Sequence, residues 1–352
     1  MKQLTKLPLL LLLISLVSCA TVESEYSLYR ENGKYGLINE KREIVLSAEY
    51  DEIQENEVYF CKSEEKGNYV YSADLEVLHK FEDGQHSIIM CSPNIFFFKT
   101  GEKIYTEIFL YSLSANKTIE SPIYVVEENF SNEPWIAGKS AFFKDDLKEF
   151  VREWHHTYPY RENRAVVVNL DFEGEIIDEN FSLVIGDVKA SADYYSEGLI
   201  PVVMNSGESR YVDVDGNVVF ECDFDFNYIN RAQPNNVHIP LVIGSFVENV
   251  AVVKAKNNQW FILDRDFNKH YLPEGYEVES YSYSNGLLLV SKTENKEKHY
   301  GFVDKNCNVV IPCDFSYAES FVGKYAIVEK DGKDAVIDKK GRIYYCSEFK
   351  NK

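Results

Sequence analysis

The sequence predicts an all-β repeat protein, β-propeller-like, with about seven or eight small antiparallel sheets. Three observations predict this fold. The 352 residues include 25 Tyr and 22 Phe but only 3 Met, a composition that favours strands over helices. A unit of apolar strand, polar turn and second apolar strand recurs along the chain. Several strands, such as Leu287 to Val290, are apolar on both faces and should be covered by neighbouring sheets.

The N-terminus has the features of a secretion signal. Lys2 and Lys6 precede an apolar run from Leu7 to Val17, and small residues follow that run. A helix that crosses a bilayer needs roughly 20 apolar residues, and this run is much shorter. We therefore expect a cleaved signal rather than a transmembrane helix.

Leu16-Val-Ser-Cys19 resembles the lipobox of bacterial lipoproteins, in which the Cys thiol is lipid-modified and becomes the first mature residue. The resemblance implies a lipoprotein signal peptide at 1–18, lipid attachment at Cys19 and a lipidated tether at 19–25. An ordinary signal with a chance cysteine is the alternative. Several acyl chains would hold the protein on a membrane, since each buried CH₂ contributes about 0.8 kcal/mol. Ala20 follows the cysteine, as in lipoproteins sent to the outer membrane, so we expect a periplasmic or surface-facing protein of the bacterial envelope.

The charge of the chain argues against nucleic acid as a partner. Lys and Arg number 37 against 57 Asp and Glu, which gives a formal net charge of −20. The basic residues are interspersed with acids, whereas a phosphate-binding surface needs them clustered. A basic partner or loosely held divalent cations would fit, but a well-hydrated surface is the commoner meaning. We expect no cofactor.

Six cysteines remain beside Cys19, and none of them forms a CxxC pair suited to zinc or redox chemistry. Six thiols allow fifteen pairings, so the sequence leaves their disulfide state open. We expect them to be small buried residues in strands. They are Cys61, Cys91, Cys222, Cys307, Cys313 and Cys346.

An Asp, Asn or Ser that ends a strand and opens a turn marks each repeat unit. Such a side chain can accept a bond from its own backbone two residues on, and Gly216 or Gly341 supplies the positive φ of a tight turn. Neighbouring marks lie 33 to 59 residues apart, which indicates a repeat with a period near 40. The marks are Asn39, Ser72, Ser112, Asp171, Asp213, Asp264, Asp304 and Asp338.

A second recurring element is an aromatic residue, a few polar or glycyl residues and an apolar run, beginning at Tyr160, Tyr195, Phe246, Tyr283 and Phe321. With Asn32-Gly-Lys-Tyr-Gly-Leu-Ile-Asn39 and His299-Tyr-Gly-Phe-Val-Asp304, these residues resemble the WG-repeat family. The namesake pair is Tyr35-Gly36, Tyr300-Gly301 and, altered further, Trp260-Phe261. The resemblance covers about Tyr26 to Tyr345. It implies an interaction module and transfers no catalytic residue.

A small sheet cannot bury its apolar face alone, so the units must pack on one another. A ring of sheets also protects strand edges, and we prefer it to an open β-solenoid, which would need polar caps. The repeat domain is expected over 26–346, with a tail at 347–352. Within it Leu147, Phe150, Val151 and Trp154 fall at helical spacing, which predicts one inserted helix at about 144–156.

Motifs for chemistry are weak. Asp213-Val-Asp-Gly-Asn217 suits calcium by its carboxylates but lacks the glycine and glutamate positions of an EF-hand, so we interpret it as a hairpin turn. His155 and His156, adjacent on the expected helix, would point about 100° apart and not converge on one metal ion. HExxH, GxSxG, GxxxxGK[ST] and GxGxxG are absent from the sequence. Carboxylate pairs for sugar cleavage meet in space rather than in sequence and stay open.

Tyrosines gather near the junctions between units and are suited to a peptide or glycan partner. Tyr160, Tyr195 and Tyr283 occupy the repeat position and are expected to pack one unit on the next. Tyr158, Tyr194 and Tyr281 are candidates for an exposed ligand rim.

These observations predict a non-catalytic, membrane-anchored envelope lipoprotein whose β-repeat domain binds a protein or glycan. The alternative is an envelope enzyme acting on glycans or peptides, with a carboxylate site on one propeller face. A structural spacer or assembly partner is a third possibility, which an exposed apolar patch would favour.

Overall fold

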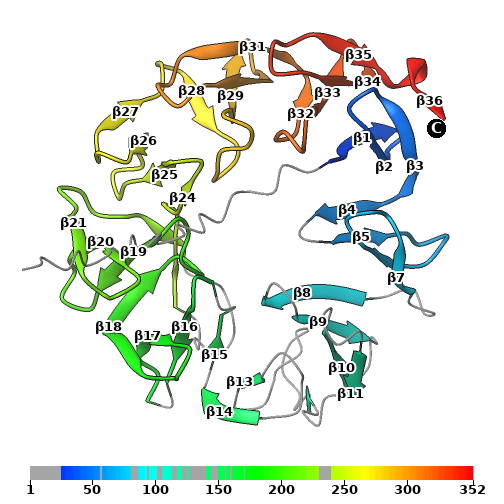
Figure 1. Ribbon diagram of the computed structural model, residues 1–352. Coiled ribbons are helices and arrows are strands. Elements are labelled where there is room, and N and C mark those ends of the chain that lie inside the picture. The colour runs from blue at the N-terminus through cyan, green and yellow to red at the C-terminus, as the bar shows by residue number, and fades with distance from the viewer. Residues whose placement is uncertain are drawn as a thin grey trace, which may run out of the picture.

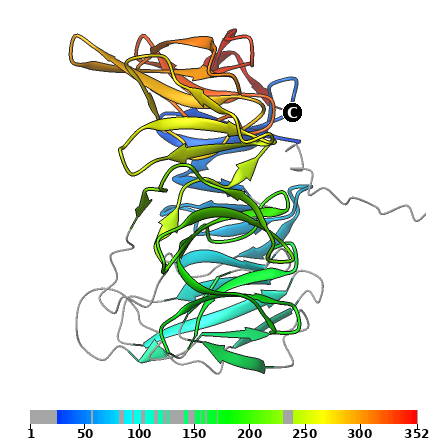
Figure 2. The same cartoon turned by 90° about the vertical axis from the view of Figure 1, so that its left-hand side faces the viewer.

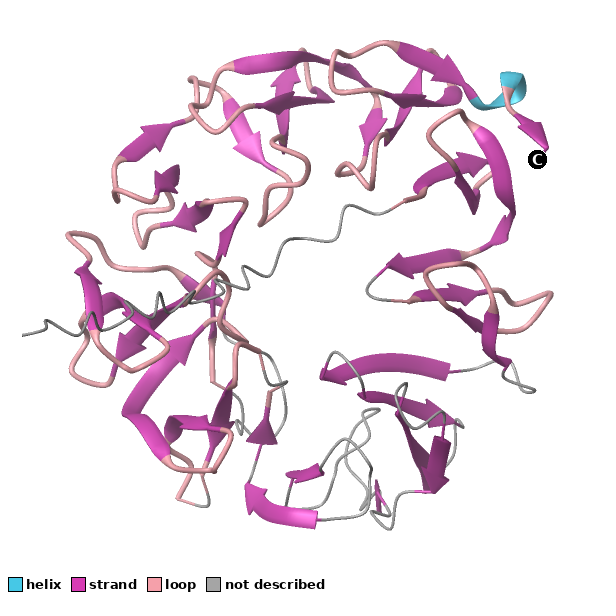
Figure 3. Ribbon diagram, in the orientation of Figure 1, coloured by secondary structure: helices cyan, strands magenta, loops and turns pink. Residues whose placement is uncertain are grey.

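The computed structural model describes residues 25–55, 58–80, 86–92, 95–100, 105–112, 117–120, 125–126, 140–143, 150–154, 156–158, 161–169, 171–229 and 239–351. These residues form strands β1 to β36 and one short 3₁₀ helix, η1 (Cys346–Glu348). Figure 3 shows that strands and connecting turns dominate the ring. The prediction of an all-β protein made of small antiparallel sheets is confirmed.

The N-terminal half contributes four sheets. The first contains β1 (Ser27–Glu31), β2 (Lys34–Ile38) and β3 (Glu43–Tyr50), and the second β4 (Glu52–Glu55), β5 (Tyr59–Lys62), β6 (Tyr69–Tyr71) and β7 (Val77–Lys80). The third contains β8 (His86–Ser92), β9 (Ile95–Thr100), β10 (Tyr105–Ser112), β11 (Lys117–Glu120) and β12 (Val125–Val126). The fourth pairs β13 (Ser140–Phe143) with β14 (Phe150–Trp154).

A nine-stranded sheet follows, in which the long strand β18 pairs with a strand on either side. Its strands are β15 (His156–Thr157), β16 (Arg164–Val168), β17 (Gly174–Asp178), β18 (Leu183–Ser191), β19 (Leu199–Met204), β20 (Ser209–Asp213), β21 (Val218–Glu221), β22 (Tyr228–Ile229) and β23 (Leu241–Val242). Because β18 belongs to two repeat units, this sheet joins neighbouring units rather than forming one large layer.

Three four-stranded sheets complete the described chain. They are β24 (Phe246–Val247), β25 (Val250–Lys254), β26 (Trp260–Asp264) and β27 (Lys269–Tyr271); β28 (Tyr276–Val278), β29 (Leu288–Glu294), β30 (Glu297–Val303) and β31 (Val309–Phe315); and β32 (Tyr317–Ala318), β33 (Ala326–Lys330), β34 (Lys333–Ile337) and β35 (Ile343–Tyr345). Figure 1 shows the sheets following one another around a ring in chain order. The arrangement is that of a β-propeller.

The predicted helix at 144–156 is wrong where the structure describes it. Residues 150–154 form β14, which pairs antiparallel with β13 in the register Ser140↔Trp154. Phe150, Val151 and Trp154 are aromatic or β-branched and suit a strand as well as a helix, and pairing with a partner strand decides between the two. Trp154 is buried and its ring lies 5.9 Å from that of Phe181. Residues 144–149 and His155 lie outside the described residues.

The predicted turns have one recurring geometry. In the unit of Asp304, Oδ1 accepts bonds from the backbone N–H of Asn306 and of Asn308, both at 2.9 Å, and Cys307 between them has a positive φ of 63°. The same two bonds to Oδ1 form at Asn39, Asp213, Asp264 and Asp338. At Ser72 the hydroxyl accepts from the N–H of Glu76. Hairpin turns at these marks are confirmed.

The mark assigned to Asp171 is displaced by two residues. Asn169 caps that turn, since its Oδ1 accepts from the N–H of Asp171 and of Glu173 at 2.9 Å. Asp178 caps a further turn of the same kind that the spacing did not predict. The side chain of Ser112 lies outside the described residues.

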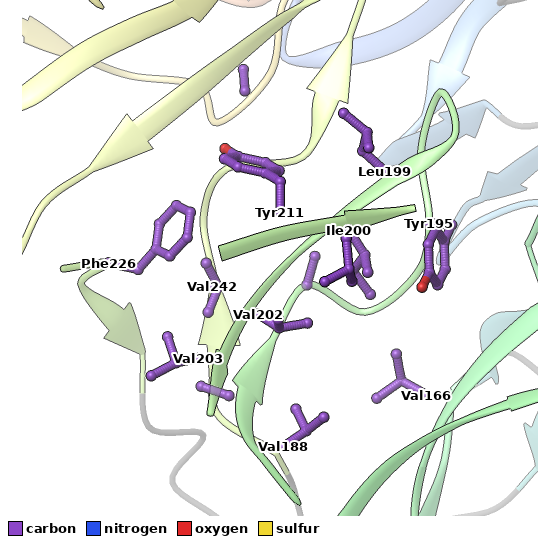
Figure 4. Close-up of a cluster of buried hydrophobic side chains, with 14 of the residues drawn as sticks. Val166, Val188, Tyr195, Leu199, Ile200, Val202, Val203, Tyr211, Phe226 and Val242 are labelled. Atoms are coloured by element: carbon purple, nitrogen blue, oxygen red, sulfur yellow. The ribbon is translucent and has the colours of Figure 1, made fainter. Parts of the chain in front are cut away.

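Strands that are apolar on both faces lie between two sheets, as predicted. In β25, Val250 and Val252 pack against Leu288 and Val290 of the next sheet. The alternate residues of β25 join the cluster of the preceding nine-stranded sheet. Figure 4 shows part of that cluster, with side chains from β16, β18, β19 and β20 beside Tyr195, Phe226 and Val242. The sheet β24–β27 therefore contributes to a buried cluster on each of its faces.

The recurring aromatic residue fastens each unit to a neighbouring strand. Tyr195 and Tyr283 are buried, and their hydroxyls donate to the backbone carbonyls of Asp213 and Asp304, each at 2.9 Å. Tyr195 also shares a buried cluster with Val166 of the preceding unit, and Tyr283 shares one with Val252 of the unit before it, which confirms the packing role predicted for both residues. Phe246 and Phe321 are also buried, whereas Tyr160 lies outside the described residues.

Glutamates in the turns after these aromatics connect consecutive units. Glu162 accepts from the N–H of Gly198 at 2.8 Å, and Glu197 from the N–H of Asn249 at 3.0 Å. Glu248 in turn accepts from the N–H of Asn285 at 2.6 Å. The turn of one unit thus caps the turn of the next, three times in succession.

The first and last sheets close the ring. Asp334 on β34 accepts bonds from Nε and Nη2 of Arg30 on β1, at 2.9 and 2.6 Å. Tyr29 packs with Tyr325 and Cys346 in one buried cluster. Strand β36 (Lys350–Asn351), inside the expected tail, pairs parallel with β3. Figure 2 shows the blue N-terminal and red C-terminal sheets side by side, so the ring, rather than the open solenoid, is the observed form.

Candidate functional site: an aromatic hollow between two sheets

A hollow with a volume of about 640 Å³ lies where the sheet β24–β27 meets the sheet β28–β31. Its aromatic lining comes from both sheets. Trp260 begins β26, Tyr271 ends β27, Tyr276 begins β28, and Tyr281 follows β28 in a loop. We call this surface the aromatic hollow.

Trp260 and Tyr281 form its central feature. Their rings are stacked, with centroids 6.0 Å apart and planes within 16° of parallel. The ammonium of Lys254 lies 5.0 Å from the centroid of Trp260, a favourable cation–π position. Tyr281 is 55% exposed and Tyr271 is 50% exposed, so these two tyrosines present aromatic area to solvent, whereas Trp260 is partly buried.

Polar side chains complete the lining. Asn258 and Gln259 come from the turn between β25 and β26, and Glu274 and Glu277 come from the segment that enters β28. These groups offer amide and carboxylate atoms beside the aromatic rings. The hollow is therefore amphipathic rather than an apolar groove.

Two tight turns shape the rim. Asn258 has a positive φ of 63°, and its N–H donates to the carbonyl of Ala255 at 2.8 Å. On the other side, the N–H of Tyr276 donates to the carbonyl of Pro273, and Gly275 has a φ of 82°. That angle is what the third position of such a turn requires, and glycine adopts it without strain.

The three candidate rim tyrosines do not form one site. Tyr281 is exposed and lies in the aromatic hollow. Tyr194 is 43% exposed, but it lies elsewhere, with the guanidinium of Arg161 5.7 Å from its ring. Tyr158 is only 5% exposed, and its hydroxyl donates to the carbonyl of Ile239 at 3.3 Å, so its expected exposure is wrong. Cys19 lies outside the described residues.

Sequence reasoning missed Trp260, Tyr271 and Tyr276 as parts of the site. A signal was present for Trp260, since it stands four residues before Asp264, where Tyr35 precedes Asn39 and Tyr300 precedes Asp304. Tyr35 also lines a hollow, of about 320 Å³, beside Glu319. The namesake aromatic position of the repeat thus lies at hollows between units in two places.

The smaller hollow contains a tyrosine and carboxylate network. Glu319 accepts from the hydroxyls of Tyr35 and Tyr317, at 2.8 and 2.5 Å. Burial, followed by the bond to Glu319, raises the pKa of Tyr35 above its ordinary value. This network lies at the ring closure, and its two hydroxyls and its carboxylate are hydrogen-bonded to one another.

The thiols are sequestered rather than reactive. Cys61, Cys307 and Cys346 are buried and free, and burial raises the pKa of each to about 12. Cys222 and Cys313, partly buried, are also free. A thiol that stays protonated at neutral pH is a poor nucleophile. Cys91 lies outside the residues whose side chains are described.

The carboxylate of Asp213 forms its hydrogen bonds within the turn that it begins. Its Oδ1 accepts from the N–H of Asp215 and Asn217, and its Oδ2 from the side-chain amide of Asn217 at 3.0 Å. The interpretation of Asp213 to Asn217 as a hairpin turn is therefore confirmed. Within the described ranges, no three His, Cys, Asp or Glu side chains are grouped to hold a metal ion. No helix there has the length and apolar character to cross a membrane.

Fold and repeat together define a β-propeller-like repeat protein. The family model described as WG containing repeat matches residues 35–57 and 300–333, at the ring closure and in the sheets next to it. These two segments therefore match the WG repeat, and the resemblance noted in the sequence is confirmed there. Among curated proteins none matches the sequence.

Solved structures with a similar path are distant in sequence. BamB from Moraxella catarrhalis has 11% identity and a TM-score of 0.38, with 83% of this chain and 86% of that chain covered. The β-propeller domain of the Trilobed protease from Pyrococcus furiosus has 10% identity and a TM-score of 0.39, with 93% and 99% covered.

Proposed function

We propose that this protein is a non-catalytic, lipid-anchored binding protein of the bacterial envelope, which presents the aromatic hollow to an envelope protein or glycan. The observation that carries the proposal is the exposed ring of Tyr281, stacked on the partly buried Trp260 at the junction of two sheets. Rigid aromatic rings give contact area at a small cost in conformational entropy, and they are enriched where proteins bind partners.

The anchor is tested at Cys19. Replacement of Cys19 by Ala removes the thiol that would carry the lipid, so the protein should move from the membrane fraction to the soluble fraction. Membrane fractionation with an antibody to the chain measures the change. Cys222→Ala is the control and should remain at the membrane. Retention of the Cys19→Ala protein at the membrane would refute the anchoring proposal.

The binding role is tested by crosslinking and capture of envelope components with the full-length protein. Tyr281→Ala removes an exposed ring from the aromatic hollow and should reduce capture of a specific partner. Tyr194→Ala removes another exposed ring, from a different part of the surface, and should not. Equal capture by both variants and the unaltered protein would place the binding surface elsewhere.

An enzyme is the second candidate, because Glu274 and Glu277 line the same hollow as the aromatic rings. Paired carboxylates beside aromatic rings also occur where glycosidic bonds are cleaved. Turnover of any cell-wall polymer by the purified protein, abolished by Glu277→Gln, would replace the binding proposal with this one.

A further inference from the structure

We infer that the aromatic hollow binds a glycan, through the apolar C–H face of a pyranose ring laid on the exposed ring of Tyr281, which Trp260 backs. The inference rests on the proposed binding function and adds the chemical class of the ligand. A pyranose has an apolar face of C–H bonds and a rim of hydroxyls. A matching site needs an aromatic platform beside polar side chains.

The platform is present. The rings of Trp260 and Tyr281 stack within 16° of parallel with centroids 6.0 Å apart, so Trp260 backs one side of the 55% exposed Tyr281 ring and leaves its other side to a ligand. Lys254 above the Trp260 ring helps to hold the tryptophan, and through it the stack, in one orientation. A platform that is already oriented loses little entropy when a flat ligand binds.

The hydroxyl partners are also present. Asn258 and Gln259 supply amide donors and acceptors, and Glu277 supplies acceptors, all in the lining of the same hollow. The volume of about 640 Å³ lies within the range of small-molecule sites. Neutral and hydroxyl-rich ligands suit this mixture better than a hydrocarbon, which would desolvate the carboxylates without replacing their hydrogen bonds.

A peptide is the competing ligand, and strand geometry disfavours its addition as an extra strand. The strands at this junction, β27 and β28, have only three residues each. A peptide added to such a short edge gains few main-chain hydrogen bonds, which are the source of affinity in that mode of recognition. A polyanion is disfavoured by the formal net charge of −20.

The test is titration of the full-length protein in detergent with four probes: cellohexaose, chitohexaose, maltohexaose and xylohexaose. A deca-proline peptide is the competing probe. Calorimetry gives affinity, and fluorescence reports on Trp260, one of three tryptophans in the chain. We expect saturable binding of at least one hexaose, with a change in tryptophan emission. Tyr281→Ala should weaken it about tenfold, and Tyr194→Ala should not.

The outcomes separate the two proposals. Absence of saturable binding for all four hexaoses, or binding equally strong in Tyr281→Ala, overturns the glycan assignment. Binding of deca-proline alone, lost in Tyr281→Ala, overturns it in favour of a peptide and leaves the binding function intact. Capture of envelope components that is unaffected by Tyr281→Ala overturns the function proposed for the hollow itself. Tyr281 is exposed in a loop, so this variant is expected to fold, and its circular dichroism spectrum checks that.

Discussion

One side-chain oxygen at the end of a strand holds each of the recurring turns, and in most of them it belongs to a carboxylate. Asp264 accepts bonds from the N–H of Asp266 and of Asn268, and a 2.9 Å bond joins it to His270. Partial burial acts to raise its pKa, but the bonds from His270 and Asn268 outweigh that effect and lower the pKa to about 2. Asn39 forms the same turn with a neutral amide oxygen. The charge is therefore dispensable for the turn's geometry.

Replacement of Asp264 by Asn should reduce the loss of stability in acid. A carboxyl group whose pKa in the folded state lies below its ordinary value of 3.8 stabilises the fold above that pH. This contribution is lost as the pH falls from about 4 toward 2, and Asn has no such titration. Urea unfolding at pH 7, 4 and 2.5 measures the difference. Asp266→Asn is the control, since Asp266 enters the turn through its backbone, and an equally steep acid loss in both variants contradicts the prediction.

The glycine of the namesake pair is required by packing. A Cβ at Gly301 would lie 2.5 Å from the carbonyl oxygen of Ile311 and 2.8 Å from the backbone nitrogen of Cys313. A Cβ at Gly36 would lie 2.5 Å from the carbonyl oxygen of Leu46. Both contacts are with the backbone of the next strand, so they are not relieved by a side-chain rotation.

Gly301→Ala should lower the free energy of unfolding by about 1–3 kcal/mol, because the partner strand must move to admit a methyl group. Chemical denaturation measures the effect. Gly186→Ala is the matched control, because its Cβ would meet Leu183 at an ordinary 3.7 Å. Equal stability of the two variants would show that the close approach at Gly301 is not a constraint.

At the scale of elements, the turn glutamates join one sheet to the next. Glu248 accepts from the consecutive N–H groups of Asn285 and Gly286. These two residues have positive φ angles of 58° and 80°, so their N–H groups belong to a tight turn. A carboxylate is suited to this role because hydrogen bonds to a charged acceptor are the stronger ones.

Glu248→Ala should destabilise the junction between β24–β27 and β28–β31 by about 1–3 kcal/mol, because two N–H groups lose their acceptor. Amide hydrogen exchange should increase at Asn285 and Gly286 before the rest of the sheet. Glu248→Gln keeps an acceptor and should recover part of the loss. Glu297→Ala, at an exposed hairpin end, is the control. If amide hydrogen exchange at Asn285 and Gly286 is unchanged in the Glu248→Ala protein, the proposed role of these hydrogen bonds is contradicted.

At the scale of the molecule, stability depends on ring closure. Arg30 and Asp334 lie 304 residues apart in the sequence, yet their side chains are bonded and only 15% and 21% exposed. In an open solenoid these residues would not interact. The closure also supplies a neighbour for each terminal sheet, which otherwise would expose an apolar face.

A double-mutant cycle of Arg30→Ala and Asp334→Ala should therefore give a coupling energy of at least about 0.5 kcal/mol in the free energy of unfolding. The exposed pair Lys256 and Asp225, at 54% and 55%, is the control and should give less. A coupling of zero would contradict the prediction that the Arg30–Asp334 pair stabilises the ring closure.

The sequence by itself determined the repeating parts. Its Asp, Asn and Ser marks located most turns, since these turns form through bonds within five residues. Strands with apolar residues on both faces indicated stacked sheets, because a strand with one face in water alternates between apolar and polar residues. These patterns depend on interactions between residues of the same unit, so they can be predicted from the sequence of that unit.

Only the tertiary structure decided features that depend on distant partners. Phe150 to Trp154 have residues compatible with helix or strand, and pairing with Ser140 to Phe143 makes them β14. Likewise Tyr158 and Tyr281 are both tyrosines near a junction, yet one is buried and the other exposed. The aromatic hollow combines residues of two neighbouring sheets, and the closure combines residues 304 positions apart. Such contacts arise from the packing of units on one another, a property that no single unit's sequence contains.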